Sequence, residues 1–218
     1  MTLAIFDLDN TLLAGDSDHA WGQFLIDQGL VDANIVKTAN DTFYADYLAG
    51  KLDIDRYLRF SLSFLAGKPL DELASLHQRF MATTIEPMIG QKSLALLDQH
   101  RQRGDTLMII TATNRFVTGP IAKRLNVSHL IACDAQIVDN QYTGLPTGIP
   151  SYQEGKVIRL QTWLDEHNQS LDGAWFYSDS RNDLPLLRQV DNPVAVDPDE
   201  TLEAQAHLHG WPIISLRG

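Results

Sequence analysis

Residues 3–11 of the chain read LAIFDLDNT, a short apolar run that ends abruptly in Asp7 and Asp9. An apolar run of this length, bounded by polar residues, is typical of a buried strand in a parallel sheet. Residues i and i+2 of an extended chain point the same way, so both carboxylates can face one site. Because two close carboxylates repel each other, a cation such as Mg²⁺, which prefers oxygen ligands, would stabilise the pair. Taken alone, the pair could equally be a turn or a helix cap.

Similar apolar runs recur along the chain, and helix-length segments separate the later ones. The strand candidates are Leu3–Phe6, Thr106–Ile110, Leu130–Ala132, Ala174–Tyr177, Pro193–Val196 and Pro212–Ile214, and the helix candidates are Ser93–Arg103, Arg115–Leu125, Glu154–Glu166 and Leu184–Val190. This alternation predicts an α/β fold with a doubly wound, mostly parallel sheet. Ligands of such sheets bind beyond the carboxyl ends of the strands, where the polar clusters of this chain fall.

One long interval breaks the alternation. Residues 16–88 contain no convincing strand run and have helical periodicity, for example around Phe60 and Phe64. We therefore predict an all-helical insertion over 16–88, and a core domain made of residues 1–15 and 89–218.

A second irregularity is the segment AQIVDNQYTG, residues 135–144. Two short β-prone pieces flank Asp139 and Asn140, residue types that favour tight turns. We predict a β-hairpin here, lying on the body of the core.

The second polar cluster is ITATN, residues 110–114, where another strand candidate ends in small hydroxyl residues. The Thr111 hydroxyl and backbone N–H groups such as that of Ala112 suit a phosphate oxygen. The alternative is ordinary capping of the next helix by Thr113 or Asn114.

Two further clusters follow. Lys156 lies in the first turn of a predicted helix, where the helix dipole favours anions, so an anionic partner is expected unless the lysine is simply exposed. Residues 178–183 read SDSRND, and here Asp179 and Asp183 can turn toward one cation or serve as helix caps. Jointly, in this order and each at a predicted sheet edge, the clusters are far more specific than any one of them.

In these residues the chain resembles the haloacid dehalogenase superfamily. DLDNT resembles its motif I, Thr111 its motif II, Lys156 its motif III and SDSRND its motif IV. A helical insertion directly after motif I is similar to a type 1 cap on a Rossmann-like core, an arrangement like that of the phosphoserine-phosphatase-like subfamily IB. The segment FDLDNTLLAGDSDHAWG, residues 6–22, is similar to members described as histidinol-phosphatase-like.

The resemblance implies a phosphomonoester hydrolase with an aspartyl-phosphate intermediate. Asp7 would be the nucleophile, and Asp9 the general acid and then the base. It implies Mg²⁺ bound by the Asp7 carboxylate, the Asp9 carbonyl and the Asp179 carboxylate, with Asp183 as outer support.

The same resemblance implies how the phosphoryl group is bound. Thr111, Ala112, Lys156 and Asn182 would stabilise its charge. Lys156 would also keep Asp7 ionised, since a nearby opposite charge favours the charged form of a carboxyl.

Candidate specificity residues lie in the insertion. Phosphoserine phosphatases place an acid nine residues past the nucleophile, here Asp16, and a cap arginine where this chain has Ser61. Arg59 or Arg56 could substitute for that arginine. With Asp18, Asp16 would face an amine or imidazole, although Asp18 could instead cap a helix. L-Histidinol phosphate fits best, and phosphoserine hydrolysis or phosphotransfer to an acceptor alcohol are the alternatives.

Composition narrows the classes of partner. The formal net charge is −11, without a dense Lys/Arg run, which disfavours nucleic acid and anionic membranes and favours a small phosphorylated metabolite. The single cysteine, Cys133, cannot form an intramolecular disulfide, and no apolar stretch reaches the roughly 20 residues of a membrane span. We expect a cytoplasmic protein, and its oligomeric state stays open.

The main non-enzyme alternative is a receiver domain, which also uses acids, a hydroxyl residue and a lysine on a doubly wound sheet. Its phosphorylated aspartate would follow the third strand, and it needs no helical insertion. In this chain the leading acid pair follows the first strand, which favours the phosphatase.

Overall fold

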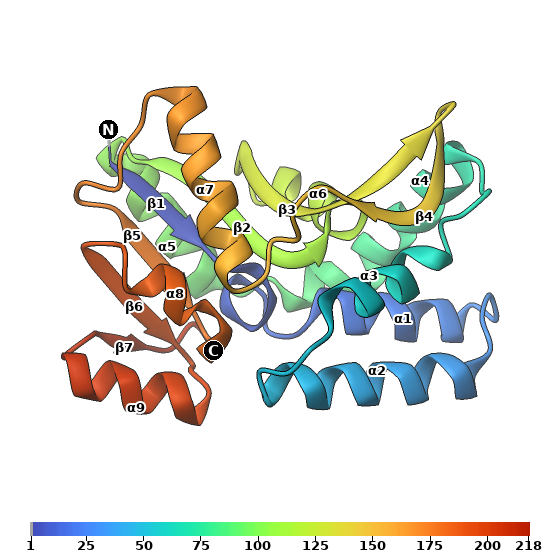
Figure 1. Ribbon diagram of the computed structural model, residues 1–218, viewed down its shortest axis with the longest axis horizontal. Helices are drawn as coiled ribbons and strands as arrows, with labels where there is room; N and C mark the ends of the chain where they lie inside the picture. The colour runs from blue at the N-terminus through green and yellow to red at the C-terminus, as the bar shows by residue number, and fades with distance from the viewer. Residues whose placement is uncertain (1) are drawn as a thin grey trace.

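The computed structural model describes residues 2–218, and its strands form one sheet in the order β4-β3-β2-β1-β5-β6-β7 (Figure 1). The strands are β1 Leu3–Phe6, β2 Thr106–Asn114, β3 His129–Val138, β4 Gln141–Thr147, β5 Trp175–Ser178, β6 Asn192–Val196 and β7 Ile213–Ile214. All neighbouring pairs are parallel except β3 and β4. The predicted doubly wound, mostly parallel α/β sheet is confirmed.

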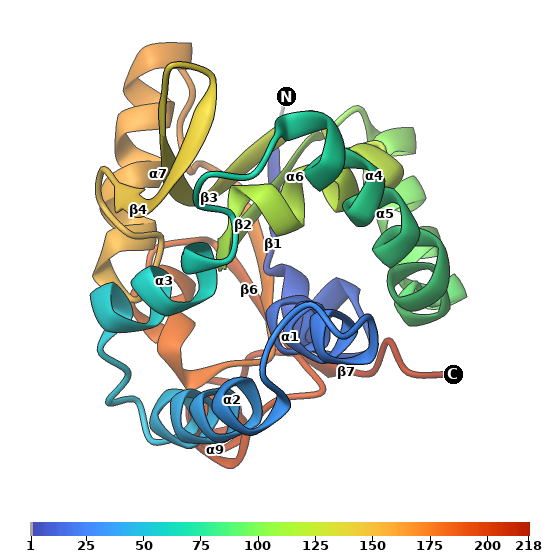
Figure 2. The ribbon, with the colours of Figure 1, turned by 90° about the vertical axis from the view of Figure 1, so that its right-hand side faces the viewer.

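The α-helices are α1 Ser17–Asp27, α2 Ala33–Leu48, α3 Ile54–Ser63, α4 Leu70–Phe80, α5 Gln91–Arg103, α6 Arg115–Arg124, α7 Glu154–His167, α8 Leu184–Leu187 and α9 Glu200–His209. In the side view, α7 lies on one side of the sheet and α5 and α6 lie on the other (Figure 2). Short helical turns cover Leu8–Leu12, Met81–Ile85, Glu86–Met88 and Arg181–Asp183.

Strand β1 sits at the centre of the sheet and is buried on both faces. Leu3 and Ile5 pack into a cluster with residues of α7, α8 and α9, whereas Ala4 and Phe6 pack into one with residues of α5 and α6. All four side chains are at most 1% exposed. Burial on both faces explains why the strand reads as a continuous apolar run and not as an alternating pattern.

Strand β2 is longer than predicted. It continues through Asn114, four residues beyond Ile110, with a register irregularity between these two residues. Pairing with Cys133 of β3 carries the polar residues onward as strand, because the ladder satisfies their backbone groups. Asn114 then caps α6 by accepting the Val117 N–H.

The predicted all-helical insertion contains α1 to α4. Its two ends meet: Leu13 and Ile89 form an antiparallel bridge, and the Ala14 N–H donates to the Met88 carbonyl at 2.8 Å. One hydrophobic cluster joins residues of α1 and α4 to the β1 side of the core, including Trp21. The insertion therefore shares part of its hydrophobic core with the core domain.

The predicted hairpin is β3 and β4, with Asp139 and Asn140 at the turn and both at positive φ. Its expected position on the body of the core is wrong, because the hairpin reaches out over the insertion (Figure 1). Tyr142 packs with the buried leucines Leu58 and Leu62 of α3. The apolar face of α3 requires a cover, and the hairpin supplies it.

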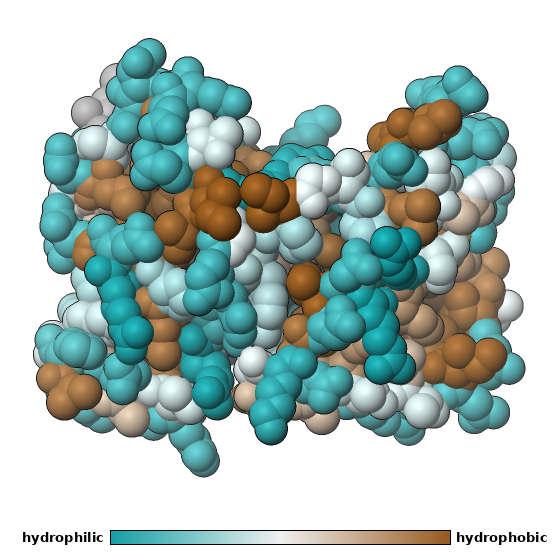
Figure 3. Space-filling model, in the orientation of Figure 1, coloured by the Kyte–Doolittle hydropathy of each residue, from teal (hydrophilic) through white to brown (hydrophobic). Residues whose placement is uncertain are grey.

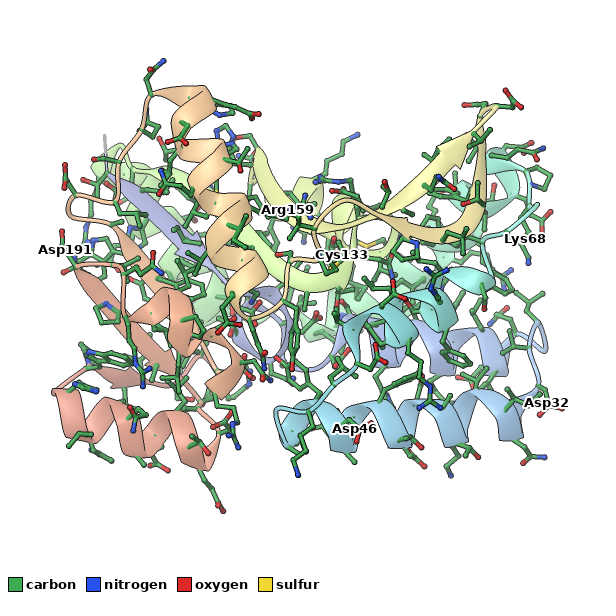
Figure 4. All side chains as sticks on the ribbon, in the orientation of Figure 1. Asp32, Asp46, Lys68, Cys133, Arg159 and Asp191 are labelled. Carbon is green, nitrogen blue, oxygen red and sulfur yellow. The ribbon has the colours of Figure 1, made fainter. Side chains whose placement is uncertain are left out.

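The face seen in Figure 3 is largely hydrophilic, with apolar patches among the polar residues. None of the helices within residues 2–218 is both long and apolar enough to span a bilayer. Cys133 lies near the centre of the view in Figure 4, close to Arg159, and it is buried. Burial raises the pKa of its thiol to about 11, which disfavours a reactive thiolate.

Candidate active site

The candidate site lies where the carboxyl ends of β1, β2 and β5 meet. From β1 the chain builds the sheet outward on one side through β2 and β3, and on the other through β5 and β6. Phe6 pairs with Ile109 on one side and Tyr177 on the other, so Asp7 emerges between two strand ends. Such a topological switch point is where open α/β sheets bind ligands.

A tight turn follows Asp7 and holds the next residues at the same place. Asp9 keeps an extended conformation, Asn10 is left-handed with φ of 53°, and the Leu13 N–H closes the turn on the Leu8 carbonyl at 3.0 Å. Asparagine tolerates the left-handed region better than most residues. The chain can therefore turn back at once without carrying Asp9 away from Asp7.

Lys156 connects the first and last acid clusters. Its Nζ lies 2.9 Å from Asp7 Oδ1 and 2.7 Å from Asp183 Oδ1, and the lysine is only 2% exposed. Asp183 also accepts the Ser178 hydroxyl at 2.7 Å. The anionic partner expected for this lysine is present, and the alternative of an exposed lysine is excluded.

The pKa of Asp7 differs from the expectation that Lys156 keeps this carboxyl ionised. Burial raises the pKa of Asp7 to about 7, against the opposing charge of Lys156, and the charges of Asp183 and Asp9 raise it further. Burial lowers the pKa of Lys156, but Asp183 and Asp7 outweigh it, so the net shift is upward. The sequence analysis expected the Lys156 ammonium to keep Asp7 ionised, but burial outweighs that attraction, so the pKa of Asp7 rises instead of falling.

Lys156 contacts Asp7 and Asp183, and its ion pairs within residues 2–218 do not include Asp179. Its Oδ1 accepts the Thr11 hydroxyl at 2.9 Å, and its N–H donates to the Thr11 oxygen at 3.1 Å. Burial, followed by the charge of Asp7, raises the pKa of Asp179 well above its usual range. The site therefore gathers the buried carboxylates of Asp7 and Asp183 and the half-buried carboxylate of Asp179 around the Lys156 ammonium, which contacts the first two.

This group of carboxylates suits Mg²⁺. Within residues 2–218 no three His, Cys, Asp or Glu side chains converge as a metal site. Mg²⁺ commonly takes only one or two carboxylates and completes its shell with waters and substrate phosphate. The carboxylates of Asp7 and Asp179, with the backbone carbonyl of Asp9, fit that requirement.

Two donors hold the Asp9 carboxylate: the Ser17 N–H at 2.6 Å from Oδ1 and the Thr113 hydroxyl at 2.8 Å from Oδ2. Burial, then the charge of Asp16, raises the pKa of Asp9 to about 6. Sequence reasoning considered Thr113 only as a helix cap, a role that Asn114 fills. The signal was available, since Thr111 and Thr113 are two apart on a strand and so face the same way.

Thr111 and Ala112 line the cleft beside Asp7, as the phosphate-binding prediction requires. Asn182 does not line it. The Asn182 amide nitrogen donates to the Tyr47 carbonyl of the insertion at 3.1 Å, and its oxygen accepts the Tyr152 hydroxyl at 3.1 Å. In this conformation Asn182 therefore joins the insertion to the core instead of facing the phosphate position.

The candidate specificity residues separate into two groups. Asp16 caps α1 by accepting the N–H groups of Asp18 and His19, so Asp16, and not Asp18, is the cap. Asp18 is buried and accepts the Asn114 amide at 3.1 Å. Both acids line the cleft. Arg59 does not: it pairs with Asp55 at 2.7 Å on the exposed side of α3, one helical turn away along the same face.

The Arg56 guanidinium lies 5.6 Å from the centroid of the Phe43 ring, and Arg56 does not line the cleft either. The structure thus brings neither arginine to the place of a carboxylate-binding group.

The cleft between core and insertion is acidic and aromatic. Its walls are formed by Asp7, Asp9, Asn10, Asp16, Asp18, His19, Asn40, Phe43, Tyr44, Tyr47, Leu52, Tyr57, Thr111, Ala112 and Thr113. Burial raises the pKa of Asp18 to about 6, against the opposing effect of the Tyr57 side chain. These lining residues, all within 2–218, include no Arg or Lys. A ligand that is cationic away from its phosphate suits such walls.

A last contact, from far along the chain, was not foreseen from the sequence. The Arg217 guanidinium donates to the Thr11 carbonyl at 3.2 Å and to the Asn10 carbonyl, and it lies 3.8 Å from Asp197. It therefore secures the turn that carries Thr11, the partner of Asp179. A single arginine so distant in sequence carries no local signal for this role.

A family model for haloacid dehalogenase-like hydrolases matches residues 4–188 of the chain. A histidinol-phosphatase of Neisseria meningitidis serogroup C is 46% identical over 219 residues, which cover 99% of each chain.

Solved structures give the same grouping. A Bordetella pertussis protein of unknown function superposes with a TM-score of 0.92, at 40% identity and with all of both chains covered. A phosphoserine phosphatase in the form of a phospho-aspartyl intermediate analogue superposes at 0.72, with 16% identity and 99% and 93% of the two chains covered, a likeness of fold. The chain therefore belongs to the haloacid dehalogenase-like hydrolase family, and it is an enzyme of the phosphatase class that its sequence predicts.

Proposed function

We propose that this enzyme hydrolyses a small phosphomonoester through a phosphorylated Asp7. The observation that carries the proposal is the Asp7 carboxylate held by Lys156 at the switch point of the sheet, with the Asp9 carboxyl beside it in the same cleft. In the first step, an Asp7 oxygen attacks phosphorus, the bond to the substrate oxygen breaks, and Asp9 gives its proton to the leaving alkoxide. A pKa of about 6 suits Asp9 to act as an acid and then as a base near neutral pH.

In the second step, Asp9 takes a proton from water, the water oxygen attacks phosphorus, and the bond to Asp7 breaks to release phosphate. Thr111, Ala112 and Lys156 would stabilise the phosphoryl charge throughout. Mg²⁺, bound by Asp7, Asp179 and the Asp9 carbonyl, would neutralise charge on the transferred group when present. Transfer to an acceptor alcohol would use the same residues, and product analysis with added alcohol separates it from hydrolysis.

For the substrate we propose L-histidinol phosphate. The name of the 46% identical relative favours it, as do the acids and aromatic rings of the cleft. Phosphoserine is the alternative, but its carboxylate would enter a cleft whose lining, within residues 2–218, offers no arginine or lysine. Unpaired anionic groups in such a site are costly.

The test is a comparison of kcat/KM for L-histidinol phosphate and L-phosphoserine with Mg²⁺ present. We expect a preference of at least about 100-fold for histidinol phosphate, which corresponds to roughly 3 kcal/mol, the scale of an unpaired buried charge or hydrogen bond. Equal values, or a preference for phosphoserine, would reject the proposed substrate and leave the phosphatase proposal standing.

Removal of the Thr113 hydroxyl tests the role of Asp9. The Thr113→Val enzyme is expected to lose roughly 10- to 100-fold in kcat on an alkyl phosphate, because Asp9 loses one of its two hydrogen bonds. The loss should be much smaller with p-nitrophenyl phosphate, whose leaving group needs no proton. Thr118→Val is the matched control, since Thr118 is buried and, within residues 2–218, its hydroxyl donates only to the Asn114 carbonyl. Equal losses on the two substrates would argue against positioning of the acid.

The Arg217→Gln variant tests whether this arginine positions the metal-binding carboxylate. We expect the Mg²⁺ concentration for half-maximal activity to rise about tenfold, the scale for residues that orient metal ligands, with the substrate KM almost unchanged. Arg217→Lys should recover part of the loss. Arg188→Gln is the control, because Arg188 is exposed and, within residues 2–218, donates only to the Gln205 side chain. An unchanged Mg²⁺ requirement in Arg217→Gln would contradict this role.

A further inference from the structure

A second hollow adjoins the cleft inside the insertion. It lies among α1, α2 and α3 and holds about 240 Å³, whereas the cleft over Asp7 holds about 60 Å³. Figure 4 labels Asp32 and Asp46, which mark the two ends of α2, the helix that forms one wall. Asp18 and Asn40 line both spaces, so they form the boundary between the cleft and this side chamber.

The cleft and the side chamber differ in volume, and this difference suggests which part of a substrate each can hold. Pockets that bind small molecules commonly occupy several hundred Å³, far more than the cleft provides in this conformation. A phosphate group above Asp7 leaves little room there for the rest of a substrate. The side chamber is the larger of the two adjoining spaces.

The residues at the boundary between the cleft and the side chamber are closely packed. A Cβ added to Gly22 of α1 would lie 2.6 Å from the Asn40 side-chain nitrogen, so glycine is needed for Asn40 to take its place between cleft and chamber. Asp18 is held there by the Asn114 amide, which donates to its Oδ1 at 3.1 Å. The Asp18 carboxylate therefore has a fixed position between the cleft and the chamber.

The walls of the side chamber combine flat apolar surface with a few polar groups. Trp21, Phe60 and Phe64 supply aromatic surface. Ser61 is one of the residues that line the chamber, and its hydroxyl oxygen is buried without a hydrogen-bond partner within residues 2–218. Because buried polar groups are almost always bonded, this hydroxyl has a bonding capacity that the described residues do not use.

We propose that the side chamber binds the ring end of the substrate, and that the ring is a flat azole with one N–H donor and one nitrogen acceptor. Asp18 would accept the ring N–H, and the Ser61 hydroxyl would donate to the other ring nitrogen, while the aromatic walls cover the ring faces. This assignment rests on the proposed function, whose substrate carries an imidazole, and it adds the location of the ring and two residues that select it.

The test fills the chamber without touching the catalytic residues. In Ser61→Leu the larger side chain should exclude the ring, so KM for L-histidinol phosphate is expected to rise at least tenfold. Activity on phosphoethanolamine, which keeps the ammonium and phosphate but has no ring, should stay within twofold. Ser75→Leu, at an exposed position of α4, is the matched control. Ser61→Ala keeps the space open and should raise KM for the ring substrate only about three- to tenfold.

A binding measurement completes the test. Calorimetry with L-histidinol, the product without phosphate, should give weaker binding to Ser61→Leu than to wild type, with thermal unfolding used to confirm a folded protein. Equal losses of activity on L-histidinol phosphate and phosphoethanolamine in a folded Ser61→Leu enzyme, or no loss on either, would show that the assignment of the chamber is wrong. The phosphatase proposal would still stand. If Ser61→Leu does not fold, an unchanged KM in Ser61→Ala overturns the assignment. If wild type hydrolyses phosphoethanolamine but not histidinol phosphate, the proposed substrate fails and this inference falls with it.

Discussion

The Asp7→Asn enzyme is expected to release no measurable phosphate, a loss of at least about 10³-fold, while it folds as the wild type does. An amide oxygen is a far weaker nucleophile than a carboxylate, so the phosphorylated intermediate cannot form. The fold should persist because Asn has nearly the same shape as Asp and because Lys156 keeps its contact with Asp183. Phosphate release, thermal unfolding and mass spectrometry of quenched reactions measure the three parts of this prediction.

The matched control for Asp7→Asn is Asp55→Asn, which removes an exposed carboxylate on α3. This control should keep both activity and stability, since exposed ion pairs contribute less than about 1 kcal/mol. In quenched wild-type reactions the added mass of one phosphoryl group should be found on the peptide that contains Asp7. A folded Asp7→Asn enzyme with near-normal phosphate release would eliminate the covalent mechanism.

The central part of this fold could be predicted from sequence because its signals are local. Strand β1 has the predicted bounds, since a fully buried strand requires an unbroken apolar run. Asp7 follows β1, Thr111 lies near the carboxyl end of β2 and Lys156 lies in the first turn of α7, and the parallel arrangement of strands brings these positions to one edge. The order of motifs along the chain thus carried most of the information about the site.

The parts that could not be predicted depend on contacts between distant segments. Arg59 is an arginine in the right helix, but only the helix orientation decides that it reaches Asp55 instead of the cleft. Asn182 has two polar atoms that could bind phosphate, yet the insertion supplies the Tyr47 carbonyl as one partner. The hairpin was recognised from its turn, whereas its packing against α3 required the position of the insertion.

Lys156 pairs with the buried carboxylates of Asp7 and Asp183, so its replacement is expected to have the largest effect on stability. Lys156→Met would keep most of the side-chain volume but leave Asp7 and Asp183 buried together without a cation. Breaking a buried pair by removing one partner typically costs about 3–5 kcal/mol, because the remaining charge has lost its water and its partner. We therefore expect a clear fall in the melting temperature at pH 7.5, together with a loss of at least about 10³-fold in kcat.

The pH dependence distinguishes this explanation from a simple loss of packing. Carboxylates without a cation in a buried site take up protons more readily than in the unfolded chain, so the folded variant binds more protons and gains stability, relative to wild type, as the pH falls. The stability deficit of Lys156→Met should thus shrink between pH 7.5 and 5, and Lys123→Met, at an exposed position of α6, should show no deficit at either pH. A deficit that is the same at both pH values would mean that Lys156 stabilises the fold through its packing and not through its charge.

Normal activity in a folded Lys156→Met enzyme would remove the lysine from the mechanism, because no other ammonium or guanidinium within residues 2–218 lies within 4 Å of an Asp7 carboxylate oxygen.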